Sequence, residues 1–434
     1  MAGKRLVLIG QTLSFDGDPA ADARALVHSS DGAVLVEDGL IAWAGERADL
    51  PADLADGAEF HDYGDGLILP GFVDGHVHYP QIGVIASFGT QLLDWLETYT
   101  FPEEARFADP AYARDAARLF LDLLLANGTT TAAVYCTVHP ESADAFFQES
   151  DARGLRMIAG KILMDRNAPE SVRDTAQQGY DDAKALIGRW HGRGRALYAV
   201  TPRFAPTSTP AQLEACGVLM REHPDVYLQS HVSENLDEVK WVAELFPDAR
   251  SYLDVYGRYG LLGPRALYGH AIHMDAADLA LAADTGARFV HCPTSNLFIG
   301  SGLFRLHQTR AAGVEVLLGS DVGGGTSLSP FATMKAAYEI AQFAGRSLTP
   351  EEAFWLSTAG GADALSLGDR VGRLAPGFEA DIAVLDLAST PMVRQRVDRA
   401  ESLRDVLFAQ MILADDRAVL ATYAAGKLVH RRAG

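Results

Sequence analysis

The sequence has few cysteines, fewer cations than anions, and no long apolar run. Its three cysteines, Cys136, Cys216 and Cys292, are an odd and widely spaced set. Such a set does not form a disulfide framework, so we expect a reducing compartment, the cytoplasm. No apolar stretch reaches the roughly 18 residues that a membrane-spanning helix needs, and the apolar start of the chain is too short for a signal peptide. We therefore predict no membrane partner.

The charge balance excludes another class of partner. Lys and Arg sum to 37 and Asp and Glu to 57, which gives a net charge of −20 over 434 residues. Nucleic-acid-binding proteins carry a basic face, because the release of counterions drives their affinity, so we predict no nucleic-acid partner. The composition, 48% hydrophobic and 22% charged, is that of a folded globular protein. It favours a soluble enzyme with a small-molecule substrate.

The middle of the chain alternates short apolar β-runs with longer helical patterns. The β-runs are Leu67–Val77, Thr129–Tyr135, Arg156–Leu163, Leu197–Arg203, Val226–His231, Ala266–His270, Arg288–His291 and Val314–Gly319. The helical segments between them include Asp115–Ala126, Ser171–Ile187, Pro210–Arg221 and Ser233–Leu245. Eight runs with helical crossovers predict an α/β fold, a (β/α)8 TIM-type barrel.

Both ends of the chain have strand patterns instead. Lys4–Phe15 is one strand region, and Ala33–Gly45 has the pattern of a hairpin with its turn at Glu37-Asp38-Gly39. Gly377–Asp386 and Ala418–His430 also have strand patterns. We expect residues 1–68 and 372–434 to form one small discontinuous β-sandwich domain and residues 69–371 to form the barrel.

Several β-runs end in side chains that bind metals or move protons. They are His76 and His78 on the first run, His231 on the fifth, His270 on the sixth and Asp321 after the eighth. Functional residues of such barrels lie at the carboxyl ends of the strands. Side chains alternate along a strand, so His76 and His78 point to the same side. Three histidines and one carboxylate (His76, His78, His231 and Asp321) suit Zn²⁺ or Fe²⁺ with an open position for water.

The histidine pair alone fits a second interpretation, two satisfied core histidines. The spread of candidate ligands over several runs favours the metal site. Glu234 lies three residues beyond His231, where it can take a proton from a water whose pKa a metal has lowered. Its alternative role is a helix N-terminal carboxylate that interacts with the helix dipole.

Other polar features fit a site less well. His291 ends the seventh run but Cys292-Pro293 follows it, so we expect a supporting or structural role. Most of the remaining histidines are expected on the surface or in loops: His28, His61, His139, His191, His223, His273, His307 and His430. Gly323-Gly324-Gly325 lacks both the Walker pattern and a G-x-G-x-x-G helix entry. It is interpreted as flexible backbone that passes the mouth of the site.

These residues resemble the amidohydrolase superfamily over nearly the full length. The resemblance includes the entry Pro70–His78, the single Asp321 and the tail Gly377–Asp386, and His231-Val-Ser-Glu234 resembles the aminohydrolase branch. Within that branch the sequence is most similar to the guanine deaminases. The matching stretches are His78-Tyr-Pro-Gln81, Trp95–Glu103, Thr201-Pro-Arg-Phe204, Ser230–Asn235 and His291–Asn296.

The resemblance implies an activity, a cofactor and roles. His76, His78, His231 and Asp321 would hold one Zn²⁺ per subunit, with Fe²⁺ possible, in a homodimer. Asp321 would take a proton from the water that attacks C2 of guanine, Glu234 would carry a proton to N3 and assist the loss of ammonia, and His270 would hydrogen-bond the water or the intermediate. Gln81 and Arg203 would read the polar edge of the purine and Phe204 would pack on it. His78, His231, Glu234 and Asp321 would also face the substrate, and the product would be xanthine.

One departure from the family pattern, one excluded class and two alternatives bear on this expectation. The fourth run ends at Arg203, and the nearest strand lysine is Lys161 on the third run, which favours one metal over the two that a carbamylated lysine bridges in related enzymes. The chain has no C-x-x-C, which excludes the other class of zinc nucleobase deaminases. The same residues would also serve an aminohydrolase of another heterocycle, such as an oxidised purine, a pterin or a triazine. A binding protein that keeps the barrel without activity is the third hypothesis.

Overall fold

The computed structural model describes residues 5–88 and 91–433. Lys4, the first residue of a predicted strand, and the terminal Gly434 of the predicted small domain lie outside this range. The helices are α1 (Ala52–Ala55), α2 (Leu92–Trp95), α3 (Phe101–Glu104), α4 (Pro110–Ala126), α5 (Pro140–Arg153), α6 (Ala176–Trp190), α7 (Pro210–Glu222), α8 (Leu236–Leu245), α9 (Tyr252–Arg258), α10 (Ala276–Thr285), α11 (Pro293–Phe298), α12 (Leu306–Ala311), α13 (Pro330–Phe343), α14 (Pro350–Leu356), α15 (Ala359–Ala364), α16 (Pro391–Val397) and α17 (Leu403–Leu413). None of the helices described is long and apolar enough to cross a membrane.

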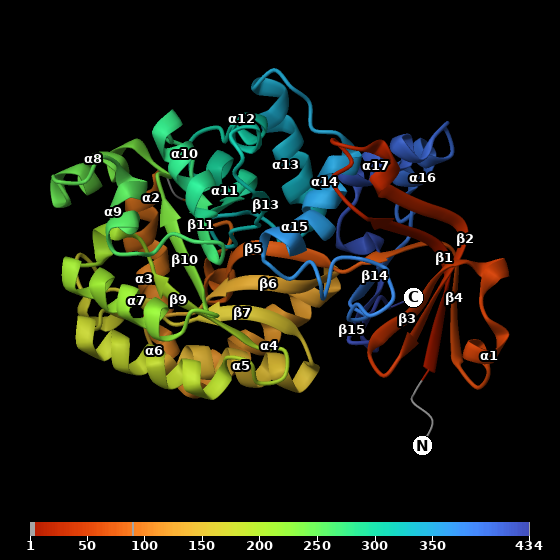
Figure 1. The fold of residues 1–434 in the computed structure, drawn as a ribbon, viewed down its shortest axis with the longest axis horizontal. Helices are drawn as coiled ribbons and strands as arrows, with labels where there is room; N and C mark the ends of the chain where they lie inside the picture. Colours follow the sequence, from red (N-terminus) through yellow and green to blue (C-terminus); the bar gives the residue numbers. More distant parts are fainter. Residues whose placement is uncertain (1–4, 89–90, 434) are drawn as a thin grey trace.

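The two ends of the chain build one mixed sheet, at the right of Figure 1. Its strands are β1 (Arg5–Phe15), β2 (Leu26–Glu37), β3 (Leu40–Glu46), β4 (Glu59–Pro70), β14 (Ile382–Leu385), β15 (Val419–Ala424) and β16 (Lys427–Arg431), in the order β16-β15-β14-β4-β1-β2-β3. β1 and β4 pair parallel, and the other neighbours pair antiparallel. Asp38 and Gly39 form the β2–β3 turn with φ of 51° and 86°, the positive values that a two-residue hairpin turn favours. The division at residues 68/69 and 371/372 stays a prediction.

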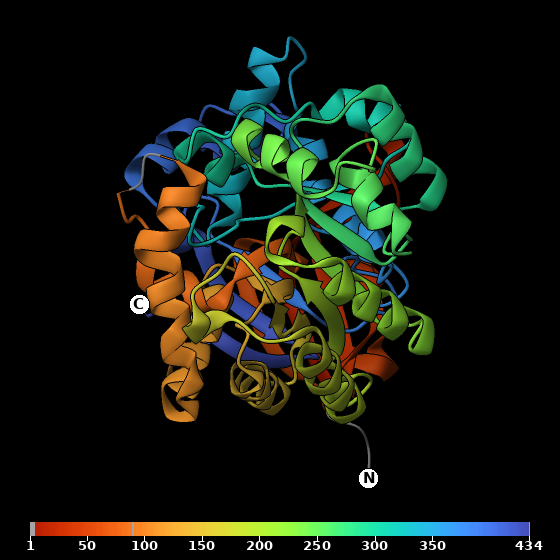
Figure 2. The ribbon, with the colours of Figure 1, turned by 90° about the vertical axis from the view of Figure 1, so that its left-hand side faces the viewer.

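Parallel strands form the second sheet, a barrel surrounded by helices (Figures 1 and 2). They are β5 (Phe72–His78), β6 (Thr129–Tyr135), β7 (Arg156–Gly160), β8 (Ile162–Leu163), β9 (Leu197–Pro202), β10 (Tyr227–Val232), β11 (Ala266–His270), β12 (Arg288–His291) and β13 (Val316–Leu318). Hydrogen bonds from His78 N to Val322 O (2.9 Å) and from Asp321 N to His76 O (2.8 Å) join β5 to the segment after β13. The predicted barrel is therefore confirmed, and its closure brings the first and last strands together.

A layer of apolar side chains fills the barrel. Each of the eight principal strands contributes one residue: Val73, Ala133, Ile158, Ala199, Tyr227, Leu267, Val290 and Leu317. Leu365, Leu367 and Val371 from the segment after α15 pack into the same cluster. Because these residues occupy the interior, the polar residues that follow them along each strand lie at one end, the carboxyl end of the barrel.

Two predicted runs are wrong in extent. Leu67–Val77 is two strands: Leu67–Pro70 belongs to β4 and pairs with β14, and the barrel begins at Phe72. The chain changes sheets at Gly71, where a Cβ would clash with Thr130. The third run, Arg156–Leu163, breaks at Lys161, whose buried ammonium pairs with Asp174 at 2.7 Å.

Two predictions near chain turns also need correction. The segment Ser171–Ile187 holds the end of a 3₁₀ turn, Glu170–Val172, and becomes α-helical only at Ala176. The side chain of Thr175 caps this α-helix by accepting a bond from Gln178 N. The tail segment Ala418–His430 is the hairpin β15–β16, not one strand. Helices α16 and α17, between the two predicted tail strands, were not predicted.

Candidate active site

Strand β5 ends in two buried histidines that point to the same side, as strand alternation predicts. The Nε2 atoms of His76 and His78 lie 3.2 Å apart. Gly269 on β11 leaves room for the His76 ring, because a Cβ there would lie 2.5 Å from its Cε1 atom. The sequence thus places two imidazoles in the barrel mouth and leaves space opposite them.

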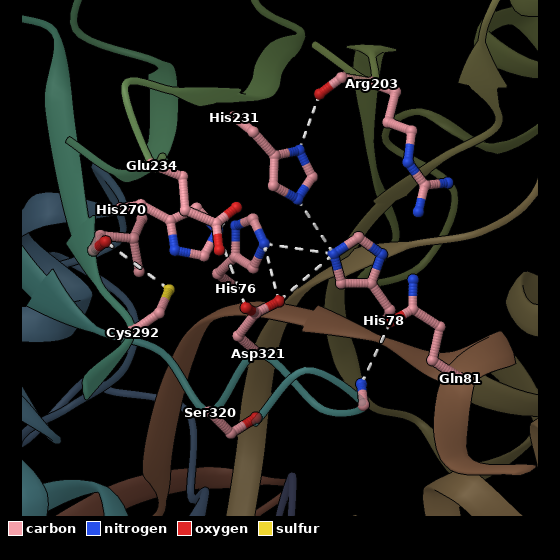
Figure 3. A network of polar contacts seen from close by, with 12 residues as sticks. His76, His78, Gln81, Arg203, His231, Glu234, His270, Cys292, Ser320 and Asp321 are labelled. Atoms are coloured by element: carbon pink, nitrogen blue, oxygen red, sulfur yellow. Dashed lines mark hydrogen bonds and ion pairs between the residues drawn. The ribbon is translucent and has the colours of Figure 1, made fainter. Parts of the chain in front are cut away.

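Two further side chains meet this pair and form what we term the His–Asp cluster: His76, His78, His231 and Asp321 (Figure 3). His231 Nε2 lies 3.2 Å from His78 Nε2. Asp321 Oδ1 lies 3.2 Å from His76 Nε2 and 3.4 Å from His78 Nε2. One ligand atom from each of the four residues lies within 4.8 Å of the others, so the set can hold one metal ion.

Burial and hydrogen bonds favour the protonation states of the His–Asp cluster that bind a cation. His231 Nδ1 donates to Arg203 O at 2.7 Å, so its Nε2 is left with a free lone pair. Burial lowers the pKa of His78 to about 3 and that of His231 well below its usual value, so both are neutral ligands. The pKa of Asp321 stays well below its usual range, against the effect of burial, because His76 lies beside it. Neutral imidazoles and one carboxylate are the donor set that Zn²⁺ binds.

A second group of ligand atoms overlaps this one. It consists of His76, His270, Cys292 and Asp321. Burial holds the pKa of the Cys292 thiol well above its usual value, so the sulfur is protonated and a poor ligand. Of the two groups, the His–Asp cluster is therefore the better suited to a metal ion.

Asp74 supports the cluster through the backbone next to two of its members, and the sequence analysis gave this residue no role. Its Oδ1 accepts from His76 N at 3.1 Å and from Ser320 N at 3.0 Å, and its Oδ2 accepts from Ser320 Oγ. Burial raises its pKa to about 6. The carboxylate ties β5 to the residue that precedes Asp321. An acid inside the apolar run Gly71–Val77 was the signal that could have revealed it.

Glu234 and His270 face each other beside the cluster (Figure 3). His270 Nε2 lies 3.3 Å from Glu234 Oε2 and 3.7 Å from Asp321 Oδ2. Ser301 Oγ donates to the other Glu234 oxygen at 3.0 Å, and His270 Nδ1 lies 2.9 Å from Asn296 Oδ1. Burial, reinforced by the charge of Asp321, raises the pKa of Glu234 to about 8. A carboxyl group whose pKa lies near neutrality is suited to both accept and release a proton.

Beside His78 lies a group that we term the polar wall: Gln81, Glu104 and Arg203 (Figure 3 shows Gln81 and Arg203). Gln81 follows β5, Arg203 follows β9, and Glu104 ends the short helix α3. Glu104 Oε1 accepts from Gln81 Nε2 at 3.1 Å and from Arg203 Nη1 at 3.0 Å, and Oε2 accepts from Arg203 Nη1 at 2.8 Å. Glu104 follows directly on the stretch Trp95–Glu103, and the sequence analysis missed it because its partners are distant in sequence.

The cluster and the wall enclose a hollow of about 400 Å³, its open mouth included. Its lining includes every predicted substrate contact: His78, Gln81, Arg203, Phe204, His231, Glu234 and Asp321. His270 also lines it, as do the apolar side chains Leu92, Trp95, Leu96 and Ile299. An apolar hollow of this size with a few convergent polar groups suits a small planar ligand.

His291 and the three glycines after Asp321 lie outside the cluster, and the structure shows the surroundings of each. His291 is buried and stacks on Phe304 with ring centroids 4.7 Å apart. Gly323, Gly324 and Gly325 are buried and tightly packed. A Cβ at Gly323 would lie 2.6 Å from Gln81 O, and one at Gly325 would clash with Ser320 O. Close approach of neighbouring atoms therefore accounts for the three glycines, and the predicted flexibility of this segment stays a prediction.

Comparisons with known proteins place the chain among hydrolases. Residues 67–429 match the Amidohydrolase family. The chain is 45% identical to guanine deaminase of Escherichia coli (strain K12), over 96% of this chain and 94% of that protein. It is 31% identical to guanine deaminase of Homo sapiens, over 84% and 83%. The solved structure of guanine deaminase from C. acetobutylicum with bound guanine in its active site is 29% identical and superposes with a TM-score of 0.88, over 98% of this chain and all of that one.

Proposed function

Because the chain belongs to the amidohydrolase family, we propose that it is a guanine deaminase, which converts guanine and water into xanthine and ammonia. The observation that carries the proposal is one cavity whose lining combines residues of the His–Asp cluster with the amide of Gln81 and the guanidinium of Arg203. The first half suits hydrolysis of a C–N bond, and the second suits recognition of a heterocycle.

We propose Zn²⁺ as the metal, one per subunit, held by His76, His78, His231 and Asp321. The fit rests on three neutral imidazoles and one carboxylate whose ligand atoms converge in a buried space. When bound, the metal would supply the Lewis acidity that brings the pKa of a water molecule close to 7. The same donor set accepts Fe²⁺.

The residues around the cluster would manage the protons. Asp321 takes a proton from the water that attacks C2 of guanine. Glu234 delivers a proton to ring atom N3 and then assists the departure of the 2-amino group as ammonia. His270, held by Asn296 on its other nitrogen, hydrogen-bonds the attacking oxygen. The contact between His270 and Glu234 keeps these two side chains together, so that both would act on the same side of the purine ring.

The polar wall and Phe204 would hold the purine. Gln81 and Arg203 face the edge of the ring that carries O6, and Phe204 packs on the ring. Arginine offers a rigid fork of donors, which suits a carbonyl oxygen beside a ring nitrogen. A site that satisfies these groups rejects rings whose edge leaves them unpaired.

The test is turnover of guanine by purified protein of known metal content. We expect stoichiometric xanthine and ammonia from the wild type, and a kcat lower by about 10²- to 10⁴-fold for Glu234→Gln with equal metal content. A panel of adenine, cytosine, pterins and triazines is measured beside guanine. A clear preference for another ring, or equal activity of the variant, contradicts the proposal.

Two further features belong to this proposal: a cytoplasmic location and a homodimeric state. The first rests on the cysteine content, three free buried thiols, and the second on the family resemblance alone. Sedimentation of the purified protein measures the oligomeric state, and a monomer at micromolar concentration would contradict the second.

A further inference from the structure

Glu104 is a buried acid without a place in the mechanism above. Its side chain is 0% exposed and that of Arg203 is 3% exposed. Among the described residues that line the cavity, Gln81 and Arg203 appear and Glu104 does not. Glu104 therefore lies behind the two side chains that face the ligand. Buried ion pairs contribute little net stability, because removing two charges from water offsets their attraction. The position of this pair therefore suggests a role in function.

The carboxylate fixes which way the Gln81 amide faces. A carboxylate accepts and does not donate, so the Gln81 atom at 3.1 Å from Glu104 Oε1 is the NH₂ group. The amide oxygen then faces Gly323 and accepts its N–H at 3.3 Å. One N–H of Gln81 is used by Glu104, and the other is left for the cavity.

The carboxylate also orients the Arg203 guanidinium. Both bonds between the two residues leave from Nη1. Phe101 supports the same group, with its ring centroid 5.5 Å from Arg203 Cζ. Since Phe101 and Glu104 begin and end the one-turn helix α3, a single short element holds the guanidinium in place. The remaining N–H groups of Arg203 are donors only.

We propose that Glu104 is the positioning residue that makes this cavity select rings carrying an oxo group, because it holds Gln81 and Arg203 with N–H donors turned to the ligand. A ring edge with acceptors, a carbonyl oxygen beside a ring nitrogen, satisfies these donors. An exocyclic amino group in place of the oxygen sets N–H against N–H and leaves buried groups unpaired. The inference rests on the proposed function, because it assigns the 6-oxo edge of the purine to this wall.

The experiment separates binding from turnover. Hypoxanthine and adenine lack the 2-amino group and differ in the oxo or amino group at C6. Their dissociation constants are measured by calorimetry on metal-quantified wild type and Glu104→Gln, and kcat and KM for guanine are measured in parallel. Gln at position 104 keeps the shape of the side chain, but its amide can also donate a hydrogen bond. The Gln81 amide can then bond to it through either its oxygen or its NH₂ group, so its orientation is no longer fixed.

The expected result is a loss of selectivity. Wild type binds hypoxanthine more tightly than adenine. In Glu104→Gln that preference falls about 10- to 100-fold, as expected for hydrogen bonds to a charged group. The kcat/KM for guanine falls as well, mainly because KM rises. The matched control is Glu103→Gln. Glu103 precedes Glu104 on α3 and bonds to Arg106 and Tyr112 instead, so the preference stays at the wild-type value.

Other outcomes overturn the inference. An unchanged ratio in Glu104→Gln, with both ligands weakened equally and a lower melting temperature, shows a purely structural residue. If that variant does not fold, Glu104→Asp keeps the charge but withdraws the carboxylate by one methylene, and an unchanged ratio there has the same meaning. Wild type that prefers hypoxanthine but does not deaminate guanine refutes the proposed function alone. Guanine turnover without a preference for hypoxanthine refutes the inference alone.

Discussion

The His–Asp cluster and the polar wall both contribute side chains to one cavity, yet the chain builds them by different means. Two cluster residues come from one strand end and the others from β10 and from the segment after β13. Closure of the barrel sets the distances between them. The wall joins the 3₁₀ turn after β5, the end of β9 and a one-turn helix, and a buried carboxylate holds these pieces together.

This difference separates two kinds of constraint. Strand alternation and barrel closure are general properties of the fold, so the cluster can serve many hydrolytic reactions. The wall depends on one ion pair and one amide orientation, so it can change without changing the fold. We infer that the cluster determines the reaction and the wall determines the substrate. Substitutions in the cluster should therefore affect metal content and kcat, whereas substitutions in the wall should affect KM and the choice of substrate.

The largest effect is expected from the cluster. His78→Ala should remove the metal and lower kcat/KM for guanine by at least about 10³-fold, since a bound metal supplies several kcal/mol of transition-state stabilisation. Elemental analysis and steady-state kinetics measure both quantities. His223→Ala, at the end of α7 and outside the cluster, should keep its metal. If the separation of the two halves is correct, metal-free His78→Ala still binds hypoxanthine.

The second effect concerns proton transfer. Glu234→Gln should lower kcat by about 10²- to 10⁴-fold, the usual contribution of a general acid–base residue, with unchanged metal content. The same substitution at the exposed Glu244, on α8, serves as the control and should retain wild-type kcat. A loss of metal in Glu234→Gln would instead place Glu234 among the ligands.

The third effect belongs to the wall. Gln81→Ala should raise KM for guanine about tenfold or more, because it removes one hydrogen bond to the ligand and leaves Glu104 with one partner fewer. Its metal content should equal that of wild type. Gln178→Ala, on the exposed face of α6, is the matched control. Loss of metal from Gln81→Ala would show that the two halves are not separable.

The sequence predicted these two halves unequally. His76 and His78 follow from a run of apolar residues and a period of two, and His231 and Asp321 follow from the ends of other runs. Arg203 ends the fourth run, but its role at the ligand, like that of Gln81, came only from the resemblance. Glu104 was missed because its partners Gln81 and Arg203 lie more than 20 residues away along the chain. Asp74 was missed although an acid inside an apolar run is a local signal. The limit of the run Leu67–Val77 was wrong because two sheets meet inside one apolar stretch.

The last and smallest effect concerns stability, not turnover. It tests Glu238, which supports the backbone at Glu234, through the pH dependence of the free energy of unfolding. This buried acid on α8 accepts from the backbone N–H of Glu234 and from Asn235 N, at 2.9 and 3.1 Å, and from Tyr252 Oη at 2.7 Å. Burial raises its pKa to about 7, above the value near 4.3 in an unfolded chain. Between these two values the folded protein holds a proton that the unfolded chain has released.

The sign of the effect follows from that difference in bound protons. The stabilisation of the protonated acid is fully present below pH 4.3 and is lost as the pH rises toward 7, by about 1.4 kcal/mol per pH unit. Glu238→Gln has no proton to lose, and its amide can accept from both N–H groups while donating to Tyr252. The free energies of unfolding in urea should therefore diverge in favour of the variant from pH 5 to pH 7 and run parallel above pH 8. Parallel curves over the whole range would show that Glu238 is already ionised in the folded protein, with its three donors offsetting the cost of burial.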